Sequence, residues 1–191
     1  MDIILIGAGG HAKAVVEILK ARGDRIVGYI DPEPSAWLDA AHIHPEAGFD
    51  DRHASIVIGL GGVSPDRLQR RLGLLDEWTG RGLPAATVIH ASAVVSSSAR
   101  LEPGVTVLAN AVVQPNVVVG RGAIVNTGAI IEHDSAIGAG THVAPGAIVL
   151  GDVEIGACAM IGAGAVILPR SKIPPQTLVK AMERAGRMGA Q

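Results

Sequence analysis

The sequence has little of what several large classes of protein require. It contains one cysteine, so no intramolecular disulfide can form. Its formal net charge of −2 offers no general basic surface to nucleic acid or to an anionic membrane. The mean hydropathy is positive, yet no apolar run approaches the ~18 residues that a membrane span needs. The amino terminus also lacks the basic region and cleavage site of a signal peptide, so we expect a cytoplasmic protein.

A six-residue repeat fills the second half of the chain. An aliphatic residue occupies every sixth position, and the residue four places after it is small or of modest size. A period of six fits neither the helical turn nor the alternation of an ordinary strand, so it indicates a repeat architecture. The fourteen aliphatic positions are Ile89, Val95, Leu101, Val107, Val113, Val119, Val125, Ile131, Ile137, Val143, Val149, Ile155, Ile161 and Ile167.

Each six-residue unit can form one short parallel strand and a turn, so that three units make one triangular coil of 18 residues. The aliphatic side chains then point into a narrow lumen, and stability comes from stacking coil on coil. Gly120, Gly138 and Gly156 occupy equivalent turn positions one coil apart, which supports this arrangement. The pattern resembles that of the hexapeptide-repeat acyltransferases, and this resemblance implies a left-handed parallel β-helix.

The first part of the chain has the pattern of an α/β unit. Asp2–Ile6 is a continuous apolar run suited to a buried parallel strand, helical spacing follows, and a second strand covers Arg25–Ile30. A second helix is expected from Ser64-Pro65, a cap followed by proline at the first turn. Its residue Trp78 should face the core.

These patterns divide the chain into three parts. Residues 1–85 should form a Rossmann-like domain of βαβ units on a parallel sheet, and residues 86–175 the left-handed parallel β-helix. Residues 176–191 follow Pro174-Pro175 and have helical spacing, so we expect a C-terminal helical tail.

The turn after the first strand is rich in glycine. It lies at the amino terminus of a helix, where free backbone N–H groups and the helix dipole favour an anionic group. Gly7, Gly9 and Ala12 match the dinucleotide fingerprint, and Asp31 follows roughly 20 residues on. The unit is short, however, it lacks a second mononucleotide-binding half, and His11 stands at the turn. A nucleotide-sugar or related phosphate is therefore favoured over a dinucleotide or a purely structural turn.

Three loop histidines could be taken for metal ligands, and the one cysteine for an acyl carrier, but their neighbours in the sequence favour neither role. His42, His44 and His53 lack a matched set of cysteines or carboxylates, so we expect solvated loop histidines and no metal site. Cys158 has no adjacent histidine to activate it, which favours a structural thiol over an acyl carrier.

His133 is the first candidate for a catalytic base. It lies two places after an inward aliphatic residue, near a corner of the coil, and therefore points outward. The residue one coil above it is Gly151, since 133 and 151 differ by one 18-residue coil. A histidine beneath a glycine offers a proton acceptor and an oxyanion donor about 5 Å apart.

His142 is the second histidine of the repeat. It follows His133 by half a coil, which places it on another side of the same prism. The two side chains can then meet only across a boundary between subunits. This arrangement predicts an active site shared between neighbouring subunits of a cyclic oligomer.

A closer resemblance covers nearly the whole chain. The sequence looks like that of the bacterial nucleotide-sugar acyltransferases, which include the UDP-4-amino-sugar N-acetyltransferases and the sialic-acid O-acetyltransferases. The stretches that carry the resemblance are Gly9-Gly-His-Ala-Lys13, Asp31, Ile89-His-Ala-Ser-Ala93, Asn126-Thr127, Ile131-Glu-His-Asp134 and His142-Val-Ala-Pro-Gly-Ala147.

The resemblance implies a homotrimer that uses acetyl-CoA to acetylate the amino group of a UDP-linked 4-amino-dideoxy sugar. It implies that His133 is the general base and Asp134 its orienting partner. Acetyl-CoA would be contacted by Asn126, His142 and the Gly151 amide. In the amino-terminal domain, the nucleotide-sugar would be bound by Gly9, Gly10, His11 and Asp31.

One departure from the family concerns the carboxy-terminal end. Relatives usually continue the repeat and finish with a Gly-x-Pro-Ala turn, whereas here Ile167 is soon followed by Pro174-Pro175. Part of the usual CoA-binding end should then be missing or rebuilt. Three alternatives stay open: an O-acetyltransferase of the sialic-acid type, a non-catalytic nucleotide-sugar-binding trimer, and an NAD-binding module.

Overall fold

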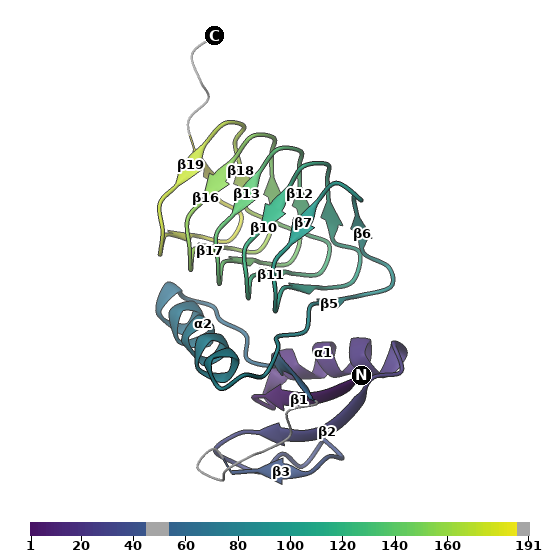
Figure 1. Cartoon of the computed structure of the whole chain (residues 1–191). Helices are drawn as coiled ribbons and strands as arrows, with labels where there is room; N and C mark the ends of the chain where they lie inside the picture. Colours follow the sequence, from purple (N-terminus) through teal and green to yellow (C-terminus); the bar gives the residue numbers. More distant parts are fainter. Residues whose placement is uncertain (45–53, 187–191) are drawn as a thin grey trace.

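The structure is a computed structural model that describes residues 1–44 and 54–186. A small α/β unit lies against one side of a long β-helix (Figure 1), and its two helices cover opposite faces of its sheet. Both predicted classes of fold, the Rossmann-like domain and the left-handed parallel β-helix, are confirmed.

The α/β unit has a four-stranded parallel sheet in the order β3-β2-β1-β4. The central strand β1 is continuously apolar because both of its faces are covered, and its last four residues are buried. The elements are β1 (Asp2–Ile6), α1 (Gly10–Ala21), β2 (Arg25–Ile30), β3 (His42–Ile43), β4 (Ser55–Ile58) and α2 (Pro65–Gly80).

The two helices follow the predicted signals. Helix α1 begins after Gly9 and ends before Gly23, whose positive φ of 76° suits glycine. Helix α2 begins after Ser64 with proline in its first turn, as predicted. Trp78 on α2 is 3% exposed and packs in the core beneath the sheet. Neither α1 nor α2, the helices of the described residues, is long and apolar enough to cross a membrane.

The β-helix has two-residue strands on three faces, and each strand pairs in parallel with the strand 18 residues away. Face 1 consists of β7 (Arg100–Leu101), β10 (Val118–Val119), β13 (Ala136–Ile137), β16 (Glu154–Ile155) and β19 (Lys172–Ile173). Face 2 consists of β5 (Val88–Ile89), β8 (Thr106–Val107), β11 (Ile124–Val125), β14 (His142–Val143), β17 (Met160–Ile161) and β20 (Leu178–Val179). Face 3 consists of β6 (Val94–Val95), β9 (Val112–Val113), β12 (Ile130–Ile131), β15 (Ile148–Val149), β18 (Val166–Ile167) and β21 (Arg184–Ala185).

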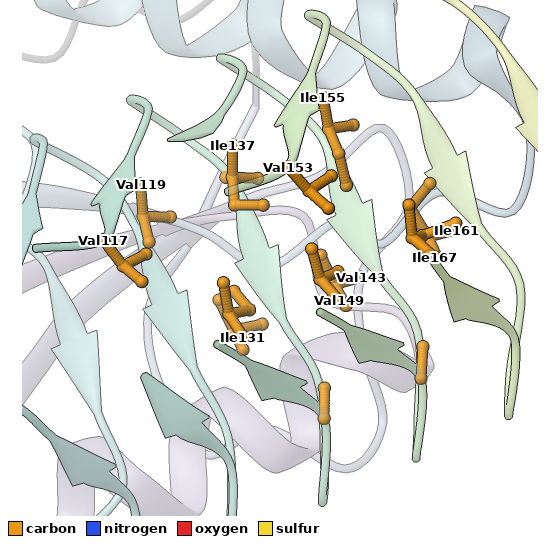
Figure 2. Packing of buried hydrophobic residues seen from close by; sticks show 14 of the residues in the cluster. Val117, Val119, Ile131, Ile137, Val143, Val149, Val153, Ile155, Ile161 and Ile167 are labelled. Carbon is orange, nitrogen blue, oxygen red and sulfur yellow. The ribbon is translucent and has the colours of Figure 1, made fainter. Parts of the chain in front are cut away.

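The second residue of each strand points into the lumen, as the six-residue period predicts. Figure 2 shows Ile131, Val143 and Val149 among the buried side chains that fill this space. The glycine corner is equally constrained, because a Cβ on Gly138 would lie 2.5 Å from backbone atoms of the next coil. A substitution there would therefore force the stacked coils apart.

The outer sides of the three faces differ. Face 2 is covered by the α/β unit, and Leu68 of α2 packs there against Ala144, Cys158 and Met160. Cys158 is thus a buried core residue, which agrees with the predicted structural thiol. Face 3 instead presents a stripe of outward aliphatic side chains one coil apart, which we call the face 3 stripe: Val94, Val112, Ile130, Ile148 and Val166.

The predicted helical tail of residues 176–191 is wrong for residues 176–186, the part that the structure describes. Strands β20 and β21 continue the β-helix, because Ile173, Val179 and Ala185 maintain the six-residue period into the lumen. Pro174 does not interrupt the stack. The residue one coil below it, Gly156, donates its N–H upward to a carbonyl, whereas Pro174 belongs to the last described coil, where no further coil accepts such a bond.

Candidate active site

His133 and Asp134 lie at the corner that follows β12. The side chains of Ile131 and Ser135, on either side of this turn, are buried, so the three residues between them, Glu132, His133 and Asp134, lie on the outer side of the coil. Asp134 has a left-handed backbone with φ of 60°, a conformation that Asp tolerates better than most residues. The side chains of His133 and Asp134 are 62% and 51% exposed, so both are accessible to a ligand.

A hydrogen-bond chain fixes the tautomer of His133. Its Nδ1–H donates to Asp134 Oδ2 over 2.8 Å, because a carboxylate oxygen can only accept. The other oxygen, Oδ1, accepts from Asn116 Nδ2 over 3.0 Å, from one coil below. Nε2 of a neutral His133 is therefore the nitrogen with a free lone pair, and it is the one available to accept a proton.

The charges around His133 shift its titration. The hydrogen bond to Asp134 raises the pKa of His133, and the negative charges of Asp134, Glu132 and Asp152 add to this effect. The Asn116 hydrogen bond, followed by the bond to His133, lowers the pKa of Asp134. Asp134 is thus held as a carboxylate that stabilises the imidazolium formed when His133 takes a proton.

Gly151 lies directly over the imidazole, as the 18-residue spacing predicted. A Cβ at this position would be 2.8 Å from both Cε1 and Nε2 of His133. The Gly151 N–H donates to no acceptor within residues 1–44 and 54–186, so it is available to a ligand. His133 and Gly151 line an open pocket of about 730 Å³ together with Leu150, Pro169 and Arg170.

His142 lies elsewhere, on face 2 beneath the α/β unit. It is 6% exposed, and its Nδ1–H donates to the Gly62 carbonyl over 2.7 Å. Its Nε2 accepts from Asn126 Nδ2 over 2.8 Å, while Asn126 Oδ1 accepts from the Thr127 N–H. Burial lowers the pKa of His142, which therefore stays neutral. The structure brings Asn126 and His142 together, but it does not bring them to His133 within one chain.

The glycine turn and Asp31 also come together. The Ala8 N–H donates to Asp31 Oδ2 over 2.9 Å, which fastens the turn to the end of β2. A Cβ on Gly9 or Gly10 would meet nothing within 4 Å, so the backbone at the start of α1 is open to a ligand. Beside this turn, Asp31 lines a pocket of about 210 Å³ whose walls are largely apolar.

His11 and Arg71 occupy the boundary between the turn and the β-helix. Burial lowers the pKa of His11 to about 3, assisted by the charge of Arg71, so His11 is neutral. Arg71 is 1% exposed, and it donates to the carbonyls of Leu60 and Gly122, which joins the α/β unit to the coils. Sequence reasoning missed this role because an arginine on an amphipathic helix is usually solvated.

Trp37 is a second residue that sequence reasoning missed. Its indole N–H donates to the Ala8 carbonyl over 2.9 Å, and Lys13 Nζ lies 5.7 Å from the centre of its ring. Trp37 and Asp31 therefore both hold the glycine turn through Ala8, one at its carbonyl and the other at its N–H. No sequence signal connects residue 37 with the turn, because the contact spans 29 residues that include helix α1 and strand β2.

In the described part of the chain, no group of three or more His, Cys, Asp or Glu side chains could hold a metal ion. His42 Nε2 bonds the Asp31 carbonyl over 2.9 Å and its ring stacks on Tyr29. The prediction for His53 lies outside the described residues.

The six-residue repeat and the β-helix that it forms agree with the comparisons with known families. Two family models match the chain: the PglD N-terminal domain over residues 2–65, and the bacterial transferase hexapeptide (six repeats) over residues 134–169. The chain belongs to the hexapeptide-repeat nucleotide-sugar acyltransferases, and it is an acyltransferase.

Solved structures agree with this assignment. PerB from Caulobacter crescentus, in complex with CoA and GDP-perosamine, is 32% identical with a TM-score of 0.87, covering 98% of this chain and 89% of PerB. The acetyltransferase domain of PglB from Neisseria gonorrhoeae is 29% identical with a TM-score of 0.86, covering 94% and 88% of the two chains. The same domain in complex with acetyl coenzyme A is 26% identical with a TM-score of 0.83, covering 97% and 98%. A search of curated protein sequences gives no significant match.

Proposed function

We propose that this enzyme transfers the acetyl group of acetyl-CoA to the amino group of a UDP-linked 4-amino-dideoxy sugar. The observation that carries the proposal is the pocket in which the free Nε2 of His133 lies beneath Gly151, with Nδ1 bonded to Asp134. The ligands of PerB and of the PglB domain support the two substrates, because one was solved with a nucleotide amino sugar and the other with acetyl coenzyme A.

In this proposal His133 is the general base. The sugar amine attacks the thioester carbonyl carbon, and the proton it loses passes to Nε2 of His133. Asp134 stabilises the resulting imidazolium through the Nδ1–H bond. The Gly151 N–H is available for the oxygen that becomes negative, and the C–S bond then breaks to release the CoA thiolate. A thiolate needs little help from an acid, so direct transfer requires no covalent enzyme intermediate.

The nucleotide would be bound by the amino-terminal domain. The open backbone at Gly9 and Gly10 and the amino terminus of α1 suit a diphosphate. His11 supports this turn from beneath as a neutral side chain, and Asp31 lies at the mouth of the adjacent pocket, where a base and ribose would sit. Competition between UDP and GDP for the enzyme would test the choice of nucleotide, with UDP expected to bind more tightly.

A homotrimer with shared sites is the second part of the proposal. The face 3 stripe supports it, because an aliphatic ladder on the outside of a sheet is suited to packing against another copy. Ile148→Lys should therefore release monomers, as measured by light scattering after size-exclusion chromatography. Ala136→Lys places the same charge on exposed face 1 and is the matched control. A trimer that survives Ile148→Lys would contradict this assignment of the stripe.

The reaction is tested by release of CoA thiol, followed with a chromogenic disulfide, with a UDP-4-amino-4,6-dideoxy sugar as acceptor. His133→Ala should lower kcat by ~10² or more, the usual size of a general-base effect. His90→Ala, which removes another histidine of the β-helix, should leave kcat unchanged. No release by the wild type, together with no binding of acetyl-CoA, would instead favour a nucleotide-sugar-binding protein. Transfer only to the matching 4-hydroxy sugar would assign an O-acetyltransferase.

In this proposal, Asn126 and His142 of one subunit contact the acetyl-CoA that lies beside His133 of the neighbouring subunit. Mixed trimers test this sharing of the site. His133→Ala and His142→Asn subunits, each of which we expect to have little activity alone, would be co-expressed with different tags and purified together. If each site takes one residue from each of two subunits, about a quarter of the interfaces in a random mixture carry neither change. We expect recovery of roughly that fraction of wild-type activity. No recovery would mean that the site is not shared in this way.

A further inference from the structure

We propose that Asn116 is a positioning residue for the catalytic pair, holding the carboxylate of Asp134 in the orientation that His133 requires. This inference rests on the proposed function, because it concerns the same base. Three strands, β10, β11 and β12, separate Asn116 from the pair and make up one full coil, so no local motif contains all three residues.

Asn116 and Asp134 are stacked at one corner of the β-helix, and His133 lies beside Asp134 on the same turn. Ser98, Asn116 and Asp134 are spaced by one coil each, and Asn116 and Asp134 both have left-handed backbones. Ser98 Oγ accepts from the Asn116 backbone N–H over 3.2 Å, which sets the height of that turn. Asn116 Nδ2 then donates upward to Asp134 Oδ1 over 3.0 Å, and Oδ2 is left for His133 Nδ1 at 2.8 Å.

Asn116 can orient Asp134 because it and His133 bond different oxygens of the carboxylate. Asp134 is about half exposed, and an exposed ion pair between His133 and Asp134 alone is weakly held, because both groups exchange partners with water. A second donor on Oδ1 fixes the rotation of the carboxylate about its terminal torsion, which is otherwise broad. The fixed carboxylate therefore sets the orientation of the imidazole and also stabilises its protonated form.

An amide is also the suitable donor at this position. The groups that face the pair are Glu132 on the same turn, Asp152 one coil above Asp134, and Arg170 one coil further. Asn116 donates from below without adding a charge, so it does not compete with the imidazolium for the negative charge of Asp134. A lysine or arginine there would form an ion pair with the carboxylate and weaken its effect on His133.

Asn110 provides an internal comparison. It occupies the same turn position at another corner, with φ of 57° against 61° for Asn116, and its N–H also donates to a serine one coil below, Ser92. The residue one coil above Asn110 is Gly128, which has no carboxylate to orient. Asn110 therefore shows the purely structural role of an asparagine at such a corner.

The experiment compares Asn116→Gly with Asn110→Gly. Glycine adopts the left-handed backbone without strain, so each change removes only the side chain. For Asn116→Gly we expect a fall in kcat of roughly fivefold to tenfold, the size expected for loss of one ordinary hydrogen bond at an exposed position, with little change in KM for either substrate. Asn110→Gly should leave both constants unchanged. In an Asp134→Ala background, Asn116→Gly should have no further effect on kcat.

Titration of the His133 imidazole by NMR gives a readout that does not depend on acetyl transfer. Loosening the carboxylate in Asn116→Gly should lower the pKa of His133, and Asn110→Gly should not. An equal kcat and an equal or higher His133 pKa in Asn116→Gly would overturn the proposal, as would a full effect of Asn116→Gly without Asp134. If the wild type transfers no acetyl group but the His133 pKa falls as expected, the proposed function fails and the positioning role stands.

Discussion

Gly151→Ala tests whether the site depends on contact between this glycine and His133. The added Cβ would lie 2.8 Å from Nε2 and Cε1 of the imidazole, whereas ordinary contacts begin at 3.4 Å. The ring must then retreat by at least about 0.6 Å from the position that the Asp134 hydrogen bond gives it. Misplacement of a reacting group by ~1 Å costs on the order of 10²-fold in rate, so kcat should fall by roughly tenfold to a hundredfold.

The stability of the protein should hardly change in this variant. His133 is 62% exposed and can turn toward solvent, and Gly151 does not have the positive φ that would strain an alanine. We expect the free energy of unfolding to change by no more than ~0.5 kcal/mol, the usual range for surface substitutions. Loss of rate without loss of stability is therefore the signature of this contact.

The assay combines initial rates of CoA thiol release with thermal unfolding followed by circular dichroism. The control is the double variant with His133→Ala, in which the alanine at 151 should lower the residual rate no further, since the ring it displaces is absent. A wild-type kcat in Gly151→Ala would refute the argument that Gly151 and His133 act together. An equal loss with and without His133 would show that the methyl group blocks a substrate instead.

Three further predictions concern the charge of the base and the two ways in which the fold is held. The hydrogen bond that His133 donates to Asp134 raises the pKa of His133, so kcat/KM in the wild type should rise with pH through a value above 6.5 as the neutral base forms. Asp134→Asn should move this rise to lower pH and reduce the plateau by roughly tenfold, as pH–rate profiles would show. Arg71→Leu leaves two backbone carbonyls without their donor at the boundary between the α/β unit and the coils, and denaturant unfolding should show a loss of ~3 kcal/mol. Gly138→Ala places a Cβ 2.5 Å from the backbone of the next coil, and a melting curve should show a loss of ~2 to 4 kcal/mol.

The repeat made part of the site predictable from the sequence. In a coil of fixed length, the residue above or below any position is found by counting, so the contact between Gly151 and His133 was available before the structure. Counting one coil down from Asp134 gives Asn116 by the same rule, although the sequence does not show that this amide and the carboxylate meet. Repeat register fixes which residues are stacked, whereas hydrogen bonds also depend on side-chain rotamers.

Contacts between the two parts of the chain were not predictable. The partner of His142 is the Gly62 carbonyl, 80 residues away in a loop of the α/β unit, and no periodicity relates the two. The end of the β-helix was missed for another reason. Pro174-Pro175 was interpreted as a stop signal, but prolines at a corner remove no ladder bond that the last described coil needs, and Ile173 and Val179 continue the period past them.

The exposure of His133 bears on what completes the site. One chain provides Asp134 beside the imidazole and Gly151 above it, yet more than half of the side chain remains open. Acyl transfer to an amine gains from a site that excludes water, since the dipoles that stabilise the transition state act more strongly there. We therefore expect the remaining wall to come from another molecule. The aliphatic face 3 stripe runs beside the corner that carries His133, so a second copy that packs on the stripe would supply this wall. Oligomerisation and catalysis are then coupled, so a substitution in the face 3 stripe that prevents oligomerisation should also abolish catalysis.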